Sequence, residues 1–571
     1  MVPDFSAEAD RFVAGLGPGF ALAGRVLWHR DIRDLASAQR FFAPSLADLH
    51  DPFALAGMQA AADRIARAIA EGEPILLYGD YDVDGTTSIV MLMKLFELAG
   101  AKASFHVPHR IREGYGMRSD VVDRAAAEGV RLIVSVDTGI RARAVVEHAR
   151  TLGIDVIVTD HHLPEEELPP ALAVINPNRP DCTYPEKNLC GAGVAFKLVQ
   201  ALMNRLAWPA DRVAKLSESF LKITALATVA DVVPLTGENR TIVKRGLEGF
   251  STVRNVGLRE LLRVAGFADG SCPTSTQVAF RIAPRINAAG RMASASDVIR
   301  LFLTSDTNEA AQIAQQLDGL NRDRQQTEQD IIEAILNECE QMPVTPDRAG
   351  LVFSGKGWHK GVVGIVASRL VERFCRPAFV LCEEEETGIV SGSGRSVARF
   401  HLLEALESMR ELFEKFGGHR QAAGVTLTAG ALDLFRERFN AYAGTLLTED
   451  DFRPMIEIDA VITLPALEDR AVYRALDLAP FGCGNPAPVF AAFDAEVVGH
   501  PAIVKEKLLK FMVRQNGRLL PLKAWRCVDR ADELQPGARI DVAFCVEEDD
   551  YSARQGLGGW AATAKDFRSS Q

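Results

Sequence analysis

The sequence predicts an α/β protein of several domains: a parallel-sheet domain, a second α/β domain reached through a long helix, and a small C-terminal β-barrel. Three observations lead to this prediction. The chain has 571 residues, and a usual domain size of roughly 100 to 200 residues favours three or four units. Between residues 50 and 235, helical patterns alternate with short β-branched runs, which is typical of a parallel α/β sheet. From 455 to 567, strand patterns and turn signals dominate.

Composition limits the classes of function. Hydrophobic residues make up 47% and charged residues 25% of the chain, which excludes wholesale disorder. The formal net charge of −12 argues against a broad basic surface that coats DNA, so any contact with nucleic acid must come from a local cationic track. The nine cysteines include no C-x-x-C pair, and neither a good signal peptide nor an apolar run of about 18 residues is present. We therefore expect a cytoplasmic protein without a membrane span.

Four apolar runs are expected to form the strands of the first domain: 74–78, 103–107, 132–136 and 155–159. Acids or histidines follow three of these runs directly: Asp80, Asp82 and Asp84, then Asp137, then Asp160, His161 and His162. Ligands of open α/β sheets bind outside the carboxyl ends of the strands, so these separate motifs should converge there.

The remaining organisation follows from helical and strand periods. Residues 307–340 keep helical spacing of apolar residues amid charged ones, which predicts a long amphipathic connector, broken near Gly319. Turn signals at 482–486 and 516–517 punctuate the strand-rich tail. The expected units are an N-terminal segment (1–50), the parallel-sheet domain (51–305), the connector (306–342), an accessory α/β domain (343–447) and the barrel (448–571).

The segment 79–88 carries the sharpest chemical signal, three acids at alternate positions after an apolar strand. A calcium EF-hand loop would place a glutamate twelfth from Asp80, but Met91 stands there, and a strand rather than a helix leads in. A hydrated acidic turn is the plainer alternative, but clustered carboxylates repel one another unless cations compensate. The pattern therefore favours a metal site.

Asp137, the Asp160-His161-His162 run and Asp231 extend this site. Each follows an apolar stretch, although Asp137 alone is also typical of a helix cap and a lone histidine pair is weak evidence of metal binding. Mostly oxygen donors with one or two imidazoles predict a hard two-metal site that clamps a phosphoryl group and activates water. No G-x-x-x-x-G-K-[ST] loop is present, so phosphodiester hydrolysis is the expected reaction.

In order along the chain, D-x-D-x-D-G at 80–85, Val136-Asp137, Asp160-His161-His162 and Asp231 resemble the four motifs of DHH phosphoesterases. Segments at 108–116, 281–291 and 358–369 are similar to the RecJ exonuclease branch, so the resemblance covers nearly the whole chain. It implies a DHH domain, an accessory domain of the DHHA1 type and a C-terminal barrel of the oligonucleotide-binding (OB) fold. It also implies two Mn²⁺ or Mg²⁺ ions, held by Asp82, Asp84, Asp137, His161 and Asp231.

The resemblance implies further roles, some catalytic and some in substrate binding. Asp80 is assigned to orienting the ligands, and His162 to the scissile phosphate or its leaving oxygen. Gly418 and His419, in the run 417–424, resemble the glycine-histidine motif of the accessory domain, where the alternative is a tight turn with a satisfied histidine. A 5′-phosphate pocket is expected from the 391–396 segment, read as a flexible nest that includes Ser393 and Arg395, together with Arg110, Arg285 and Arg291. Tyr115 is a further expected substrate contact.

The tail interleaves cations with rings, as single-strand binding requires: Lys505, Lys507, Lys510, Arg514, Arg518, Lys523 and Arg526 with Phe511 and Trp525. An ordinary amphipathic sheet with exposed lysines is the alternative. Of these residues, we expect Lys510 and Trp525 to contact single-stranded DNA.

The resulting hypothesis is a clamp-shaped, monomeric exonuclease that degrades single-stranded DNA from 5′ to 3′ in repair and recombination. A single-strand-binding protein and a RecQ-type helicase are the partners that the family implies. One alternative is a phosphodiesterase of short oligonucleotides or cyclic dinucleotides, which usually lacks the barrel. The other is a non-enzymatic DNA-binding replication scaffold, disfavoured because all identifiable ligand positions are intact.

Overall fold

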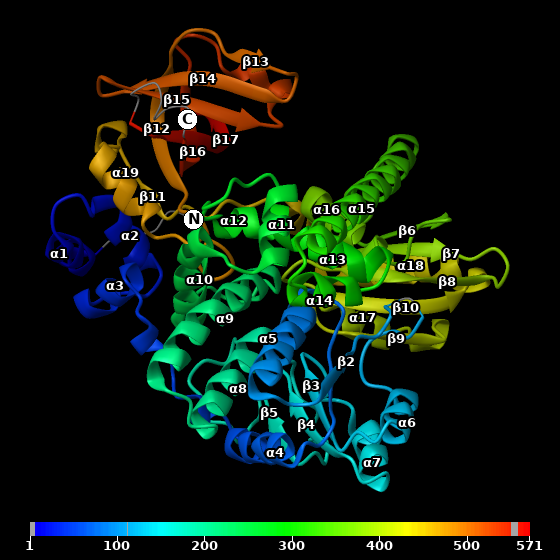
Figure 1. Ribbon diagram of the computed structural model, residues 1–571. Coiled ribbons are helices and arrows are strands. Elements are labelled where there is room, and N and C mark those ends of the chain that lie inside the picture. Colours follow the sequence, from blue (N-terminus) through cyan, green and yellow to red (C-terminus); the bar gives the residue numbers. More distant parts are fainter. Residues whose placement is uncertain (1–5, 111, 550–557, 571) are drawn as a thin grey trace.

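The computed structural model describes residues 6–110, 112–549 and 558–570, arranged as a parallel-sheet domain, an accessory domain and a barrel that carries the N-terminal helices (Figure 1). Within these residues, no helix combines the length and apolar character needed to span a membrane.

The first domain contains a parallel five-stranded sheet of order β2-β1-β3-β4-β5. Its strands are β1 (Ile75–Tyr78), β2 (Ala103–His106), β3 (Leu132–Val136), β4 (Asp155–Thr159) and β5 (Ala173–Ile175). Four lie where the apolar runs predict them, whereas the three-residue β5 was not anticipated. The β1, β3 and β4 strands are buried on both faces, which is why they read as continuous apolar runs.

Helices cover both faces of this sheet. Leu77, Val134 and Ile157 face a core formed with α4 (Met58–Glu71), α5 (Val83–Ala99) and α8 (Gly191–Arg205). Tyr78, Ile133 and Val158 face α6 (Ser119–Ala127) and α7 (Arg143–Thr151). A helical extension completes the domain: α9 (Ala210–Ala230), α10 (Gly237–Glu248), α11 (Val256–Val264), α13 (Ala283–Met292) and α14 (Ser296–Leu303).

The connector α15 (Thr307–Gln341) is one uninterrupted helix of 35 residues, so the predicted break near Gly319 is wrong. Its buried stripe includes Ile313, Leu317, Ile331 and Ile335. The first half of the helix packs on α11 and α13, and the second half packs on α16. This packing compensates for the roughly 1 kcal/mol that a glycine costs inside a helix.

The accessory domain has a five-stranded sheet of order β6-β7-β8-β10-β9, in which only β6 and β7 are parallel. The strands are β6 (Leu351–Lys356), β7 (Ala378–Glu383), β8 (Ile389–Arg395), β9 (Lys415–Gly418) and β10 (Ala422–Thr428). One face packs on α15 and α16 (Val363–Phe374), and the other on α17 (Leu402–Glu407) and α18 (Leu432–Leu446).

The C-terminal sheet closes into a barrel because β12 (Phe490–Val497) pairs with β14 (Leu508–Gln515) in addition to β16 (Arg539–Glu548). The other strands are β11 (Ala460–Val461), β13 (Ala502–Val504), β15 (Arg518–Trp525) and β17 (Trp560–Ser569), with the helix α19 (Asp469–Leu476) before β12. The predicted turn at 516–517 joins β14 to β15, with positive φ at both residues as a two-residue hairpin requires.

The N-terminal helices α1 (Ala7–Leu16), α2 (Ala21–His29) and α3 (Leu35–Phe42) pack against the barrel unit beside α19 (Figure 1). Phe12, Leu22 and Leu27 share one apolar core with the barrel strands. The two ends of the chain therefore form one structural unit, which the interpretation of 1–50 as a separate segment did not anticipate.

Candidate metal centre and nucleic-acid cleft

The carboxyl ends of β1, β3 and β4, with the C-terminal end of α9, bring the predicted metal ligands together. Three overlapping groups of side chains have possible ligand atoms within 4.8 Å of one another. They are Asp137 with His161 and His162, Asp84 with His161 and Asp231, and Asp80 with Asp82 and Asp137. The sequence thus predicted correctly which motifs meet, while the role of each residue stays a prediction.

The D-x-D-x-D-G segment is held in place by its own helix. Asp82 is the N-cap of α5, and its Oδ1 accepts hydrogen bonds from the amides of Asp84 (2.9 Å) and Gly85 (3.0 Å). A Cβ on Gly85 would lie 2.5 to 2.7 Å from backbone atoms of Asp80, so only glycine fits there. The buried Asp84 carboxylate accepts from the amides of Gly191 (2.6 Å) and Ala192 at the start of α8.

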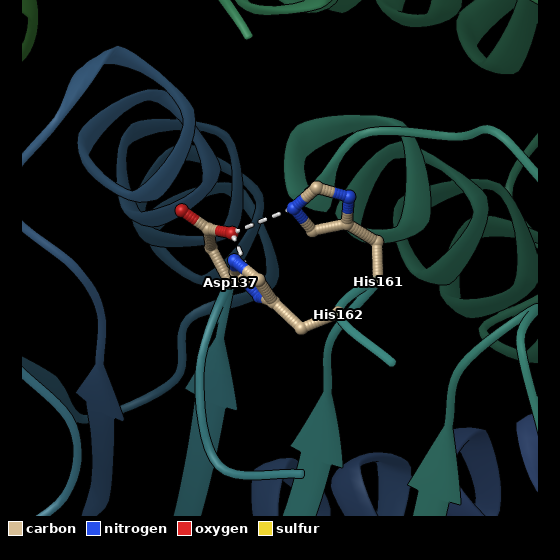
Figure 2. Close-up of side chains that lie close together, drawn as sticks. All are labelled: Asp137, His161 and His162. Carbon is tan, nitrogen blue, oxygen red and sulfur yellow. Dashed lines mark ion pairs between the residues drawn. The ribbon is translucent and has the colours of Figure 1, made fainter. Parts of the chain in front are cut away.

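Asp137 lies at the tip of β3 and faces the histidines that follow β4 (Figure 2). Its Oδ1 is 3.2 Å from Nε2 of His161 and 3.9 Å from Nδ1 of His162. The backbone of Asp137 has φ 57°, a left-handed conformation that turns the carboxylate toward the site. Nδ1 of His162 is 2.7 Å from Oδ1 of Asp160, which fixes the direction of the imidazole.

Asp231 contributes a further carboxylate to the group from the C-cap of α9. Nε2 of His161 lies 3.8 Å from Oδ2 of Asp231 and 3.7 Å from Oδ2 of Asp84. His161 therefore stands between carboxylates contributed by α5, β3 and α9.

The electrostatics of the group indicate that cations belong in it. Burial and the neighbouring Asp82 raise the pKa of Asp80 to about 8, and burial with Asp84 raises the pKa of Asp231 to about 9. Burial and neighbouring carboxylates likewise raise the pKa values of Asp84 and Asp137. One buried carboxylate oxygen each of Asp80, Asp137 and Asp231 has no hydrogen-bond partner among the described residues. Free oxygens on crowded acids, beside one or two imidazoles, fit Mn²⁺ or Mg²⁺.

Burial lowers the pKa of His161, which favours the neutral, metal-binding imidazole. Burial opposes protonation of His162, but its hydrogen bond to Asp160 and the charges of the neighbouring carboxylates together outweigh burial and raise its pKa. The adjacent histidines are thus suited to different tasks, His161 to ligation and His162 to proton or hydrogen-bond donation.

A cavity of about 490 Å³ opens beside the metal centre, between the accessory domain and the parallel-sheet domain, which holds the metal centre and is called the catalytic domain below. Tyr115, Thr138 and His162 line one side, and His419 from the β9–β10 turn lines the other. The Tyr115 hydroxyl is 3.5 Å from Nδ1 of His162. Gly418, with φ 151°, has no room for a side chain, because a Cβ would lie 2.3 Å from the carbonyl oxygen of Ala422.

Three of the predicted phosphate-binding arginines gather near the acids. Arg110 lies over the ring of Tyr81, with its guanidinium carbon 4.7 Å from the ring centre. Arg291 donates to the carbonyl of Gly361 (3.0 Å), and burial with the nearby charge of Arg110 lowers its pKa to about 10. Arg395 is half-buried and also interacts electrostatically with Arg110. Across the described ranges, no carboxylate forms an ion pair with any of the three, so they are available to an anion.

Two details of the predicted phosphate pocket differ in the structure. Arg285 forms an ion pair with Asp318 on α15 (2.8 Å) and so ties α13 to the connector instead of joining the other arginines. The 391–396 segment is mostly strand β8, whose backbone pairs with β7 and β10, so it cannot act as a flexible nest of free amides. The side chains of Ser393 and Arg395 remain candidates for binding phosphate. They lie together, because Arg395 donates a hydrogen bond to Ser393 Oγ (2.8 Å).

The barrel carries part of the predicted single-strand track. Lys510 on β14 pairs across the sheet with Lys523 on β15, and Trp525 is 57% exposed. Trp525, Lys507 and Arg526 line a shallow cavity on this surface. Phe511, however, is buried in the barrel core with its ring centre 5.6 Å from that of Phe567, so it is not a stacking platform.

Sequence reasoning missed several residues that support the site. Asn287 accepts from the amide of Val83 (3.1 Å), while Asn176 and Asn178 donate to the carbonyls of His162 (2.8 Å) and His161 (2.6 Å). Asn287 lay within the segment 281–291, which was singled out for its resemblance but given roles only for its arginines, and the other two lie in a loop without a periodic pattern. Such supporting amides act through tertiary contacts that leave no signal in local spacing.

The fold and the metal centre define a phosphoesterase of the DHH class. Three family models match the chain: the DHH family, N-terminal domain, at 74–228, the DHHA1 domain at 347–445 and the RecJ OB domain at 458–558. The chain belongs to the RecJ family, because it is 37% identical to the single-stranded-DNA-specific exonuclease RecJ of Escherichia coli (strain K12) across 88% of this chain and 89% of that protein.

Other relatives agree. The single-stranded-DNA-specific exonuclease RecJ of Bacillus subtilis (strain 168) is 37% identical across 94% of this chain, which spans 66% of that longer protein. The crystal structure of RecJ in complex with Mn²⁺ from Thermus thermophilus aligns with a TM-score of 0.83 at 31% identity, over 100% of this chain and 79% of that one. The predicted family and fold class are thereby confirmed.

Proposed function

We propose that the chain is a metal-dependent exonuclease that hydrolyses single-stranded DNA from its 5′ end and releases 5′-mononucleotides, in DNA repair and recombination. The observation that carries this proposal is that groups of opposite charge lie close together. Among the described residues, buried acids have oxygens without a hydrogen-bond partner, and arginines that form no ion pair with a carboxylate lie near them. The names of the relatives support the substrate class.

Each residue of the metal centre has a proposed task. Asp82, Asp84, Asp137, His161 and Asp231 would hold two Mn²⁺ or Mg²⁺ ions, and Asp137 belongs to two of the three ligand groups. Bound there, the ions would activate water and neutralise charge on the phosphate. Asp80 would orient the ligands. His162, held by Asp160, would donate a hydrogen bond or a proton to the scissile phosphate or its leaving oxygen.

The surrounding residues would set polarity and strand selectivity. Arg110, Arg291, Arg395 and Ser393 would bind the terminal 5′-phosphate, and Tyr115 with the Gly418-His419 turn would contact the terminal nucleotide. Lys510 and Trp525 would guide the incoming strand along the barrel.

Family membership also leads us to propose the cellular setting. A single-strand-binding protein and a RecQ-type helicase would supply unwound ends, and the enzyme would act as a cytoplasmic monomer. All nine cysteines are unpaired, as suits a reducing compartment.

Digestion of single-stranded and duplex DNA labelled at either end tests the proposal. With Mn²⁺, the 5′ label should leave first as a mononucleotide, from single strands only. Asp137→Asn should slow this release about 100-fold, because it alters a ligand shared by two of the metal groups. The matched control is Asp211→Asn, an exposed acid on α9, which should retain full activity.

Two outcomes would replace the proposal. Survival of long strands while dinucleotides are cleaved would favour a small-substrate phosphodiesterase. Tight single-strand binding without cleavage in any divalent metal would favour a scaffold.

A further inference from the structure

The turn at 481–486, between α19 and β12 of the barrel unit, contacts the catalytic domain directly beside a metal-centre residue. The contacted loop, 232–236, begins one residue after Asp231. The amide of Leu235 donates to the carbonyl of Cys483 at 2.8 Å. This contact has no part in the proposed chemistry, yet it lies within four residues of a proposed ligand.

Two glycines allow the turn to approach this closely. A Cβ on Gly482 would lie 2.7 Å from Cδ1 of the buried Leu235. A Cβ on Gly484, whose φ is +67°, would lie 3.0 Å from Cβ of Pro234. The turn and the loop can therefore lie this close together only because residues 482 and 484 have no side chain.

The turn itself is fixed from several sides. Ser275 Oγ donates to the carbonyl of Phe481 at 2.6 Å, from the catalytic domain. Asn485 is completely buried, and Arg30 of the N-terminal helices donates both to its side chain and to the carbonyl of Pro486 (2.7 Å). A turn held in this way can act as a rigid support.

The contacted loop needs such a support. Val232 directly follows Asp231 and has φ +60°, a left-handed conformation that is costly for a β-branched residue, while its side chain is 68% exposed. Its own side chain therefore contributes little to holding this conformation. The amide of Val232 donates to the carbonyl of Val229 at 3.4 Å, a long hydrogen bond. Shorter bonds fix the loop further along, from Leu235 to Cys483 (2.8 Å) and from Asn239 to the carbonyl of Pro234 (3.1 Å).

We infer that the turn at 481–486 is a positioning element for Asp231, which couples the barrel and N-terminal unit to the metal centre. The inference rests on the proposed function, in which Asp231 holds a metal ion. When the turn is in place, the strained backbone after Asp231 is fixed and its carboxylate faces His161 and Asp84. When the turn shifts, Val232 can relax and the carboxylate moves away.

The test is Mn²⁺ binding to the full chain, measured by electron paramagnetic resonance of free Mn²⁺. Gly484→Ala adds one methyl group against Pro234 and should weaken Mn²⁺ binding about 10-fold, as loss of ligand orientation does elsewhere. The matched control is Gly499→Ala, also in the barrel, with φ +72° and open space around the added Cβ. It carries the same backbone strain and should bind Mn²⁺ as the unaltered chain does.

Two further variants separate the possible failures. Asp231→Asn gives the loss expected when the ligand itself is altered, and unchanged Mn²⁺ binding by Asp231→Asn would overturn both the ligand assignment and the inference. If Asp231→Asn weakens binding but Gly484→Ala does not, the metal role of Asp231 stands and the inference alone fails. Should Gly484→Ala not fold, Ser275→Ala removes only the bond to Phe481 and should weaken Mn²⁺ binding in the same direction; no change would again overturn the inference.

Discussion

At the scale of single residues, the metal centre contains acids whose pKa values are raised, because burial and neighbouring carboxylates disfavour their charged form. Asp231 shows this most simply, because burial and Asp84 raise its pKa to about 9, against an ordinary value near 3.8. Without metal, the folded state holds a proton on Asp231 that the unfolded state has released above about pH 4. The contribution of Asp231 to the free energy of unfolding must therefore fall as pH rises from about 4 to 9.

Asp231→Asn tests this reasoning, since asparagine keeps the shape and does not titrate. In EDTA, the variant and the unaltered chain should have similar Tm values near pH 4. Toward pH 9 the Tm of the variant should exceed that of the unaltered chain by a few degrees, which corresponds to about 1 to 2 kcal/mol in the free energy of unfolding. Thermal unfolding across pH measures this, with the exposed Asp211→Asn as the control. A Tm difference that does not vary with pH would contradict the raised pKa.

The sequence predicted the residues whose position follows from a strand end. Asp80, Asp137 and His161 each follow a buried strand, and a parallel sheet places such residues at one edge whatever the rest of the chain does. Arg285 was placed in the wrong group because its partner, Asp318, lies on a helix whose docking no local pattern reveals. Phe511 could have been placed correctly, because Leu509, Phe511 and Val513 alternate with more exposed residues and point into the barrel.

At the scale of elements, the connector shows where local propensity gives way to packing. Glycine at 319 favoured a break, but α15 continues through it because its buried stripe is held by neighbours on both halves. The other element that differed, β8, reads as a Ser-Gly loop yet is a central strand. The strand needs glycine at 392 and 394, because a Cβ at either position would collide with β7.

Gly319→Ala should stabilise the chain by about 0.5 to 1 kcal/mol, because alanine loses less backbone entropy in a helix and an added Cβ meets nothing within 4 Å. Thermal or urea unfolding measures the gain, and exonuclease activity should not change. The contrasting variant is Gly246→Ala in α10, where the Cβ would lie 2.4 Å from that of Ala225 and should destabilise. Lower stability in Gly319→Ala would mean that the connector bends at this residue.

At the scale of the whole molecule, net charge and DNA binding are reconciled by where the cations lie. The chain carries a net charge of −12, yet Arg110 and Arg291 lie near the acids of the metal centre, and Lys507 and Arg526 lie beside Trp525 on the barrel. The helix α15 connects the catalytic and accessory domains (Figure 1). Residues of both domains line the cavity beside the metal centre. Interaction with a strand therefore depends on a few local cations, and binding should weaken with added salt.

The N-terminal helices and the barrel form one core, and this predicts how the molecule unfolds. Leu27 on α2 is fully buried among barrel residues, so Leu27→Ala should destabilise that unit by about 2 to 5 kcal/mol through lost burial and a cavity. Trp28 and Trp560 pack in or against this core, so tryptophan fluorescence during urea unfolding reports the change.

The matched control is Leu35→Ala on α3, where the same side chain is 50% exposed and its removal should alter stability by less than about 0.5 kcal/mol. Because residues 7–42 reach the barrel from the opposite end of the chain, removing the barrel would expose the apolar faces of α1 to α3. Equal losses in the two variants would mean that the helices do not share the barrel core. A loss confined to Leu27→Ala would support a single core shared by the N-terminal helices and the barrel.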